Sequence, residues 1–289
     1  MKKSLIIAMG VLLCAFIPIA AFAQNDIGSL YSPSSLSTGG ITTAVPSPYA
    51  DILNPASSGG SQRGVVDINY IGLAGLGTTS GWGNVANLGI TIPTPIGVFS
   101  GSGRYIGSSF PTLDLGNVGM FNLSFSKDIY PNLYVGAGLD FQIGSTWGLG
   151  LDLGFMDMPG DLWILKDFKW GAALRNIGKG YTSLGGSAAG GVGTTPPAFT
   201  PAIGASFNLL KTHDFALGLT PDLSFPSFQD VRFTMGTDFT YRDFLRVDAA
   251  YVADLVDIQK GTARTIPFSL GVSFNLKTDV KKQIAFLGI

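Results

Sequence analysis

The sequence predicts an all-β fold, a transmembrane antiparallel β-barrel of about 12–14 strands with a small N-terminal plug segment. Three observations predict it. Apolar and polar residues alternate along most of the chain, as in strands with one apolar face. Only 13% of the residues are charged, against about 25% in ordinary soluble domains. Beyond the N-terminus no apolar run reaches the roughly 18 residues that a membrane-spanning helix needs.

The clearest alternation lies between Leu133 and Met156, where we expect a hairpin of two long strands. One face carries large apolar side chains, and the other carries Gly, Asp and Gln. Soluble sandwiches present Lys, Glu and Thr on their outer faces, so this pattern favours a wall with lipid outside and a narrow, wet interior. Closed barrels and helices are the structures that satisfy all backbone groups in lipid.

Residues 1–23 have the features of an export signal. An apolar core from Leu5 to Ile19 follows two lysines, and Ala21-Phe22-Ala23 has the small-residue pattern that precedes cleavage. We expect cleavage after Ala23. The only cysteine, Cys14, lies inside this signal, so the mature chain would have no disulfide and no Cys metal site. A lipid-modified Cys14 is the alternative, although Leu13 is too bulky for a good lipobox.

Residues 24–63 are rich in Ser, Thr, Gly and Pro, and their Ser-Pro and Asn-Pro steps favour turns over a spanning strand. We therefore expect an N-terminal plug here. Asn54-Pro55-Ala56 alone could be an ordinary turn, with Pro fixing φ. As part of a plug, its gating residues would be Asp51, Asn54, Pro55, Ala56 and Arg63.

Residues 64–276 form the predicted barrel, in which strand-like alternation recurs at short spacing. Spanning strands need about 9–11 residues each, and we count about 12 of them. A hidden strand within residues 93–118, together with the tail 277–289, would raise the number to 14; the tail could instead be an extension. Pro159-Gly160-Asp161 indicates a turn.

Seven charged residues fall on the polar side of the alternation and would line the lumen: Asp140, Asp152, Arg175, Arg232, Asp238, Arg246 and Asp248. Unpaired charges would be costly in a narrow interior. They form either a paired network that packs the barrel or a pore lining that selects what passes. The formal net charge of −1 gives no reason to expect nucleic acid as a partner.

No chemical motif in the chain indicates an enzyme, a cofactor or a metal site. The sole histidine, His213, is followed by Asp214 but has no nucleophile motif beside it. Because a catalytic triad needs a nucleophile, a base and an orienting group, we expect His213 to be a turn or interface residue.

Three segments together resemble the long-chain fatty acid porins of the FadL type and the related PorV-type outer-membrane proteins, closest to a spirochaete branch of them. These segments are the Asp51–Ala56 stretch, the run Gly-Ala-Ala-Leu-Arg-Asn-Ile-Gly at 171–178, and Pro-Ala-Ile-Gly-Ala-Ser-Phe at 201–207. The resemblance implies an outer-membrane location and passive uptake of small hydrophobic molecules such as long-chain fatty acids. Capture would occur in an apolar pocket near the outer rim, and movement of the plug would permit passage.

Two other functions stay open at this point. The PorV-type resemblance implies a binding platform that holds exported proteins, with other envelope proteins as partners; long external loops without an internal apolar pocket would favour it. A secreted soluble β-sandwich, such as a carbohydrate-binding one, would instead bury the apolar faces between two stacked sheets. For the first function the partners are outer-membrane lipid and a small hydrophobic ligand.

Overall fold

The computed structural model describes residues 43–46, 52–75, 81–110, 113–144, 146–179, 199–242, 244–259 and 268–274. The predicted signal 1–23, the gating candidate Asp51 and the tail 277–289 lie outside the described residues.

The described part contains 12 strands, all in one sheet and each antiparallel to its neighbour in the chain. They are β1 (Val65–Gly75), β2 (Gly81–Thr94), β3 (Gly97–Phe110), β4 (Leu113–Tyr130), β5 (Leu133–Ile143), β6 (Trp147–Leu162), β7 (Leu165–Lys179), β8 (Thr200–Lys211), β9 (Phe215–Ser224), β10 (Arg232–Tyr241), β11 (Leu245–Asp254) and β12 (Phe268–Phe274). The strand number agrees with the lower end of the predicted range.

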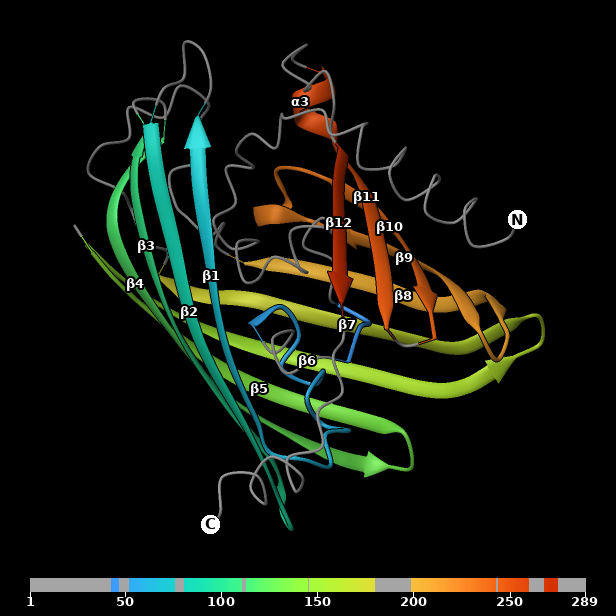
Figure 1. Ribbon diagram of the computed structural model, residues 1–289. Helices are drawn as coiled ribbons and strands as arrows, with labels where there is room; N and C mark the ends of the chain where they lie inside the picture. Colours follow the sequence, from blue (N-terminus) through green and yellow to red (C-terminus); the bar gives the residue numbers. More distant parts are fainter. Residues whose placement is uncertain are drawn as a thin grey trace, which may run out of the picture.

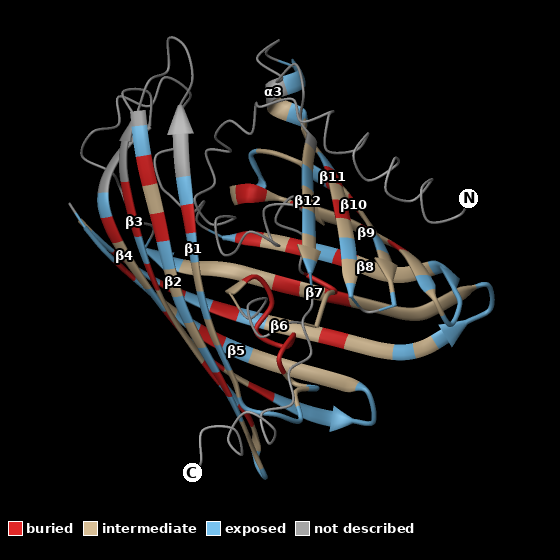
Figure 2. Ribbon diagram, in the orientation of Figure 1, coloured by how far each residue is buried: buried red, intermediate tan, exposed pale blue. Residues whose placement is uncertain are grey.

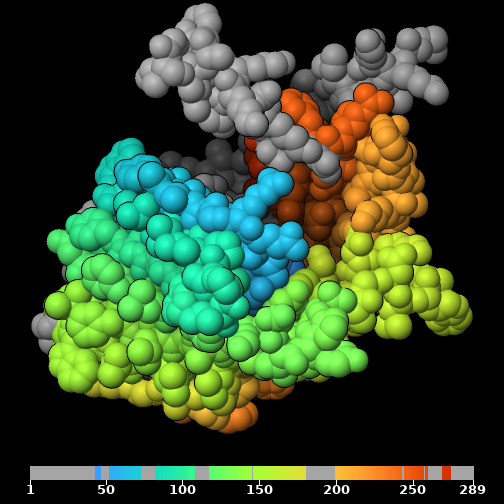
Figure 3. Space-filling view, turned by 90° about the horizontal axis from the view of Figure 1, so that it is seen from below, coloured from blue at the N-terminus to red at the C-terminus, as the bar shows by residue number. Residues whose placement is uncertain are grey.

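This sheet curls strongly, so that β1 and β12, the two edge strands among the described residues, come round towards each other (Figure 1). The colours in the space-filling view follow the strands around the wall in chain order (Figure 3). Two short helices accompany the wall, the 3-10 helix η4 (Pro226–Phe228) and α3 (Leu255–Gln259). Among the described residues, no helix has the length and apolar character needed to span a bilayer.

The two faces of the wall differ in the way that the alternation predicts. On β4 the outward Leu123 is 67% exposed, whereas its neighbour Asn122 points inward and is 4% exposed. The same alternation of exposed and buried residues runs along most strands (Figure 2). No second sheet covers the outer face among the described residues. The two stacked sheets of a soluble sandwich are therefore absent from this part of the chain, and the arrangement is that of a transmembrane β-barrel.

The two ends of the barrel have connections of different length. At one end, which we name the short-turn end, five connections of two or three residues follow β2, β4, β6, β8 and β10. At the other, which we name the long-loop end, residues 76–80, 111–112 and 144–146 are short connections, and the long ones are residues 180–199, 225–231 and 255–267. β1 begins and β12 ends at the short-turn end (Figure 1).

Two strand boundaries differ from the sequence prediction. Residues 93–118 hold no additional strand, because β3 and β4 extend through this region from both sides. Pro159-Gly160-Asp161 does not turn the chain: β6 runs on to Leu162, and the turn falls at residues 163–164. Gly160 has a φ of 85° at a register shift in the β6–β7 pairing, so these residues form an irregularity inside the strand.

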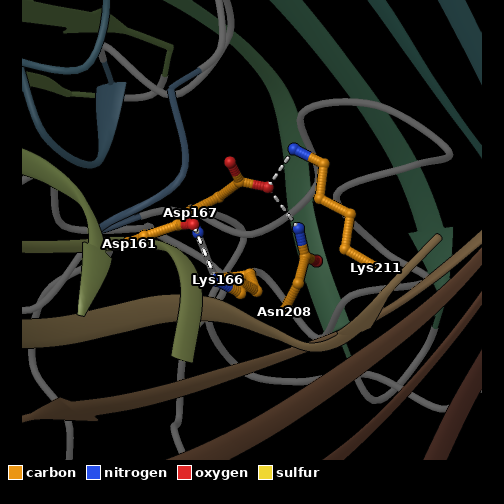
Figure 4. A network of polar contacts seen from close by, with 5 residues as sticks. All are labelled: Asp161, Lys166, Asp167, Asn208 and Lys211. Atoms are coloured by element: carbon orange, nitrogen blue, oxygen red, sulfur yellow. Dashed lines mark hydrogen bonds and ion pairs between the residues drawn. The ribbon is translucent and has the colours of Figure 1, made fainter. Parts of the chain in front are cut away.

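Polar contacts at the short-turn end join three strands (Figure 4). Lys166 Nζ lies 2.8 Å from Asp161 Oδ2 across the β6–β7 turn. Asp167 Oδ2 accepts hydrogen bonds from Lys211 Nζ at 2.5 Å and from Asn208 Nδ2 at 2.7 Å, which links β7 to β8. Each exposed ion pair contributes little to the stability of a protein. This network therefore fixes the positions of side chains at the short-turn end and adds little to the stability of the barrel.

At the same end, Arg242 joins two neighbouring turns. Its backbone N–H donates to the carbonyl oxygen of Asp214, and its Nε donates to Asp214 Oδ1 at 2.8 Å. The hydrogen bond from Arg242 lowers the pKa of the Asp214 carboxyl, and a hydrogen bond with His213 acts in the same direction.

We expect Arg242→Gln to raise the pKa of Asp214 towards its ordinary value of about 3.9. Because the carboxylate form is the one stabilised, the contribution of the pair is present above this pH and is lost as the pH falls through the lower folded value. Carbon NMR of labelled aspartate in detergent micelles measures the midpoint. An identical midpoint in both proteins would contradict the ion pair.

We also expect Leu123→Arg to destabilise the barrel in a bilayer by about 2–4 kcal/mol, the cost of an arginine facing lipid near mid-membrane. Denaturant titration of the protein folded into vesicles, followed by heat-modifiable gel mobility, gives the free energy of unfolding. Leu123→Ala is the matched control and should cost much less. If both variants unfold alike, this face does not contact acyl chains.

Candidate functional site

The N-terminal segment lies inside the curve of the wall and is almost completely buried (Figures 1 and 2). We name residues 43–46 and 52–60 the plug segment. Asn54 is 0% exposed, and Leu53, Ala56, Ser57 and Ser58 are buried with it. A segment this polar becomes buried only if its backbone and side chains find hydrogen-bond partners.

Asn54 supplies several of these bonds. Its Nδ2 donates to the Thr43 carbonyl oxygen at 2.6 Å and to the Phe155 carbonyl oxygen at 3.0 Å. Its Oδ1 accepts the backbone N–H of Ala56 at 3.0 Å, which is the local turn bond expected of Asn before Pro. One side chain thus closes its own turn, ties two parts of the plug segment together and fixes both to β6.

The wall meets the plug segment with glycines. We name Gly136 on β5, Gly154 on β6 and Gly171 on β7 the glycine shelf. A Cβ at Gly136 would overlap the Pro55 carbonyl, a Cβ at Gly154 would overlap Asn54 Oδ1, and a Cβ at Gly171 would overlap the Thr43 carbonyl oxygen. The plug backbone therefore packs against the strand backbones at a distance that no side chain allows.

Two further contacts hold the plug segment on either side of the shelf. Ser58 Oγ lies 2.9 Å from Ser126 Oγ on β4. At the other side, Thr43 hydrogen-bonds the Asp222 carboxyl on β9. The plug segment consequently bridges the inner wall from β4 to β9.

The predicted gating residues do not all gather at one place. Asn54, Pro55 and Ala56 are buried on the shelf, and they form the site. Arg63 is exposed just before β1, apart from that cluster. Asp51 lies outside the described residues. The sequence did not single out Gly136, Gly154, Gly171 or Asp222, although glycines on the inward side of three strands were a visible signal.

Among the predicted lumen charges, three lie close together next to the shelf. Asp152 is buried, and its Oδ1 accepts the backbone N–H of Asn176 at 2.7 Å. Arg175 and Asp140 are its charged neighbours. Asp140 Oδ1 accepts a hydrogen bond from Asn122 Nδ2 at 2.7 Å, which carries the polar contacts on to β4.

The remaining four lumen charges lie on β10 and β11. Arg246 Nε donates to Asp248 Oδ1 at 2.7 Å, and Asp248 is buried. Asp238 is directly opposite Asp248 in the β10–β11 register. Arg232 pairs with Asp254 at 3.5 Å. The pairs Arg246–Asp248 and Arg232–Asp254 agree with a paired network on these two strands, whereas Asp238 faces a carboxylate of like charge in Asp248.

A polar ladder on the inner face of β1 to β3 was not predicted. Asn69 Nδ2 donates to Asp67 Oδ2 at 2.6 Å, Asn87 Nδ2 donates to Asn69 Oδ1 at 2.9 Å, and Arg104 Nε donates to Asn87 Oδ1 at 3.0 Å. The inner wall here is therefore polar. Ser100, Ser102 and Arg104 alternate in the sequence and could have indicated this face.

His213 lies in the β8–β9 turn with its side chain almost fully exposed. Its Nδ1 lies 3.4 Å from Oδ1 of Asp214, its neighbour in the chain. This position is that of a turn residue, as the sequence favoured, and it lies outside the site described above.

No known protein family matches the chain, and no curated protein matches it in sequence. Among solved structures it is similar to a KdgM porin in complex with disordered oligogalacturonate, at 13% identity and a TM-score of 0.42 over 68% of this chain and 94% of that chain. It is also similar to a KdgM porin at 10% identity and a TM-score of 0.41, over 74% of this chain and 100% of that chain.

We expect Gly136→Ala to displace the plug segment while the barrel still folds, because the new methyl group would overlap Pro55. A cysteine at Ser57, with Cys14 replaced by Ser, should then react with a water-soluble maleimide much faster. Gly138→Ala is a matched control two residues along the same strand face, where a Cβ meets its nearest atoms at an ordinary 3.6 Å. Equal labelling of the two variants would show that the shelf does not hold the plug.

Proposed function

We propose that this protein is an outer-membrane barrel through which small solutes diffuse passively, and that the plug segment controls the passage. The observation that carries the proposal is the burial of Asn54-Pro55-Ala56 on the glycine shelf inside a wall with an apolar exterior. In this proposal the short-turn end faces the periplasm, because bacterial barrels have short periplasmic turns and longer external loops.

A docked plug can act as a gate because, apart from the chain connection through residues 61–64 into β1, polar contacts hold its described part to the wall. The donors and acceptors of Asn54, Ser58 and Thr43 can exchange wall partners for water when the plug moves. The chain contains no motif for an energy source, so flux would follow the concentration gradient.

Two solute classes compete for this passage. Small hydrophobic molecules such as long-chain fatty acids are the class that the family resemblance implies, with capture near the outer rim, and they are our first candidate. The polar ladder Asp67–Asn69–Asn87–Arg104 favours a second candidate, small hydrophilic solutes, because such a lining replaces their hydration. A platform for exported proteins depends on the external loops, and residues 180–198 and 260–267 lie outside the described part.

Vesicles that contain the purified protein provide the test, with a labelled fatty acid and a labelled disaccharide offered in parallel. Asn54→Ala removes the hydrogen bond that fixes the plug segment to Phe155 on β6, and also the one that joins the two parts of the plug segment through Thr43. We expect a loss of about 2 kcal/mol in docking, which raises the undocked population roughly thirtyfold. Uptake of the true solute class should rise accordingly, and deletion of residues 44–60 should raise it further.

Asn117→Ala is the matched control, because Asn117 is exposed on the wall away from the plug segment and contacts Tyr105. It should leave uptake unchanged. If vesicles with protein take up both labels no faster than empty vesicles, even after deletion of residues 44–60, passive transport is wrong although the fold stands.

A further inference from the structure

A shallow groove of about 210 Å³ lies on the outer wall across β5, β6 and β7. Its walls are the outward side chains of Leu139, Leu149, Leu151 and Ile177, and Trp147 and Lys179 stand at one end. Trp147 is the first residue of β6 and Lys179 is the last of β7, so this end of the groove lies at the long-loop end of the barrel.

A β-bulge lies directly beside the groove. Asp152 on β6 faces two residues of β7, Arg175 and Asn176, because the register jumps between the pairs Leu151↔Ile177 and Leu153↔Leu174. Asn176 has a φ of 57°, and its N–H donates to Asp152. Two residues further on, a Cβ at Gly178 would overlap the Leu149 carbonyl oxygen, so only glycine lets the backbones of β6 and β7 approach this closely beside the groove.

The groove contains one cation in apolar surroundings. Lys179 Nζ lies 3.6 Å from the centroid of the Trp147 ring, a cation–π contact that holds the ammonium against the wall. Within the described part of the chain, no ion pair joins Lys179 to a carboxylate. An ammonium at the edge of an apolar surface is most stable beside an anion, so the groove matches a ligand that has a hydrocarbon chain and an anionic group at one end.

We propose that this groove binds a lipid of the surrounding leaflet, with an acyl chain along the leucines and a phosphate on Lys179. The groove lies on the apolar outer face of the wall, which faces lipid in a transmembrane barrel. Membrane lipid is therefore the molecule that is already in contact with the groove. A tryptophan beside a lysine also matches the interfacial height of a headgroup. The inference relies on the membrane location in the proposed function and is independent of transport.

Fluorescence quenching tests this site in bilayers of phosphatidylcholine. The protein carries Trp82→Phe, Trp163→Phe and Trp170→Phe, so that Trp147 is its only tryptophan. Brominated phosphatidic acid, brominated phosphatidylcholine or brominated oleic acid is then added. We expect phosphatidic acid to reach half-maximal quenching at an about fivefold lower mole fraction than phosphatidylcholine, the preference that one lysine near an anionic lipid gives. Lys179→Gln should abolish this preference, and Lys179→Arg should keep it.

Lys127→Gln is the matched control. Lys127 is exposed near the short-turn end of β4, on the same outward side as Leu123, and its loss should leave the preference intact. Heat-modifiable gel mobility verifies that each variant is folded. The proposal is overturned if Lys179→Gln keeps the preference, if wild type shows none, or if oleic acid is preferred as strongly as phosphatidic acid. Absent uptake with an intact lipid preference would refute transport alone.

Discussion

The cost of an unpaired backbone group in lipid is the constraint on which this structure depends. A wall exposed to acyl chains needs its strands paired, and β2 to β11 each pair with both of their chain neighbours in one antiparallel sheet. Strand geometry then points every second side chain inward. The polar and small residues, which are unfavourable against lipid, occupy these inward positions. Glycines, serines, amides and carboxylates therefore collect inside, where each charge needs a partner. The pairing of Arg246 with Asp248 and the ladder that ends on Arg104 meet this need.

The inward glycines make the interior more than a polar lining. Where large side chains alternate with Gly136, Gly154 and Gly171, the outer face keeps its apolar surface while the inner face is bare backbone. A second piece of chain can then approach the strands closely, and Asn54 reaches the Phe155 carbonyl group, which belongs to the wall itself. The features that fit the wall to lipid and those that dock the plug segment are thus the two faces of the same strands.

Much of the wall follows from the sequence, because strand alternation is local. The hairpin from Leu133 to Met156 has the predicted faces, and the polar phase of β10 and β11 contains the charges that the pattern placed there. Irregular backbone could not be predicted from the sequence. Gly160 can form either a turn or an irregularity within a strand, and the choice depends on its β7 partner. Contacts between segments that are distant in the sequence could not be predicted either. Asn54 and Phe155 are 101 residues apart, and no local pattern indicates such a pair.

That separation has a consequence for biogenesis. The plug segment is made before the strands that hold it, and its docking surface is complete only when β5, β6 and β7 lie side by side. Closing so long a loop is entropically slow, so docking is expected late in assembly. If the plug segment gates the barrel as proposed, a barrel whose wall is complete before docking is an open pore, and each newly inserted copy leaks until its plug segment has docked.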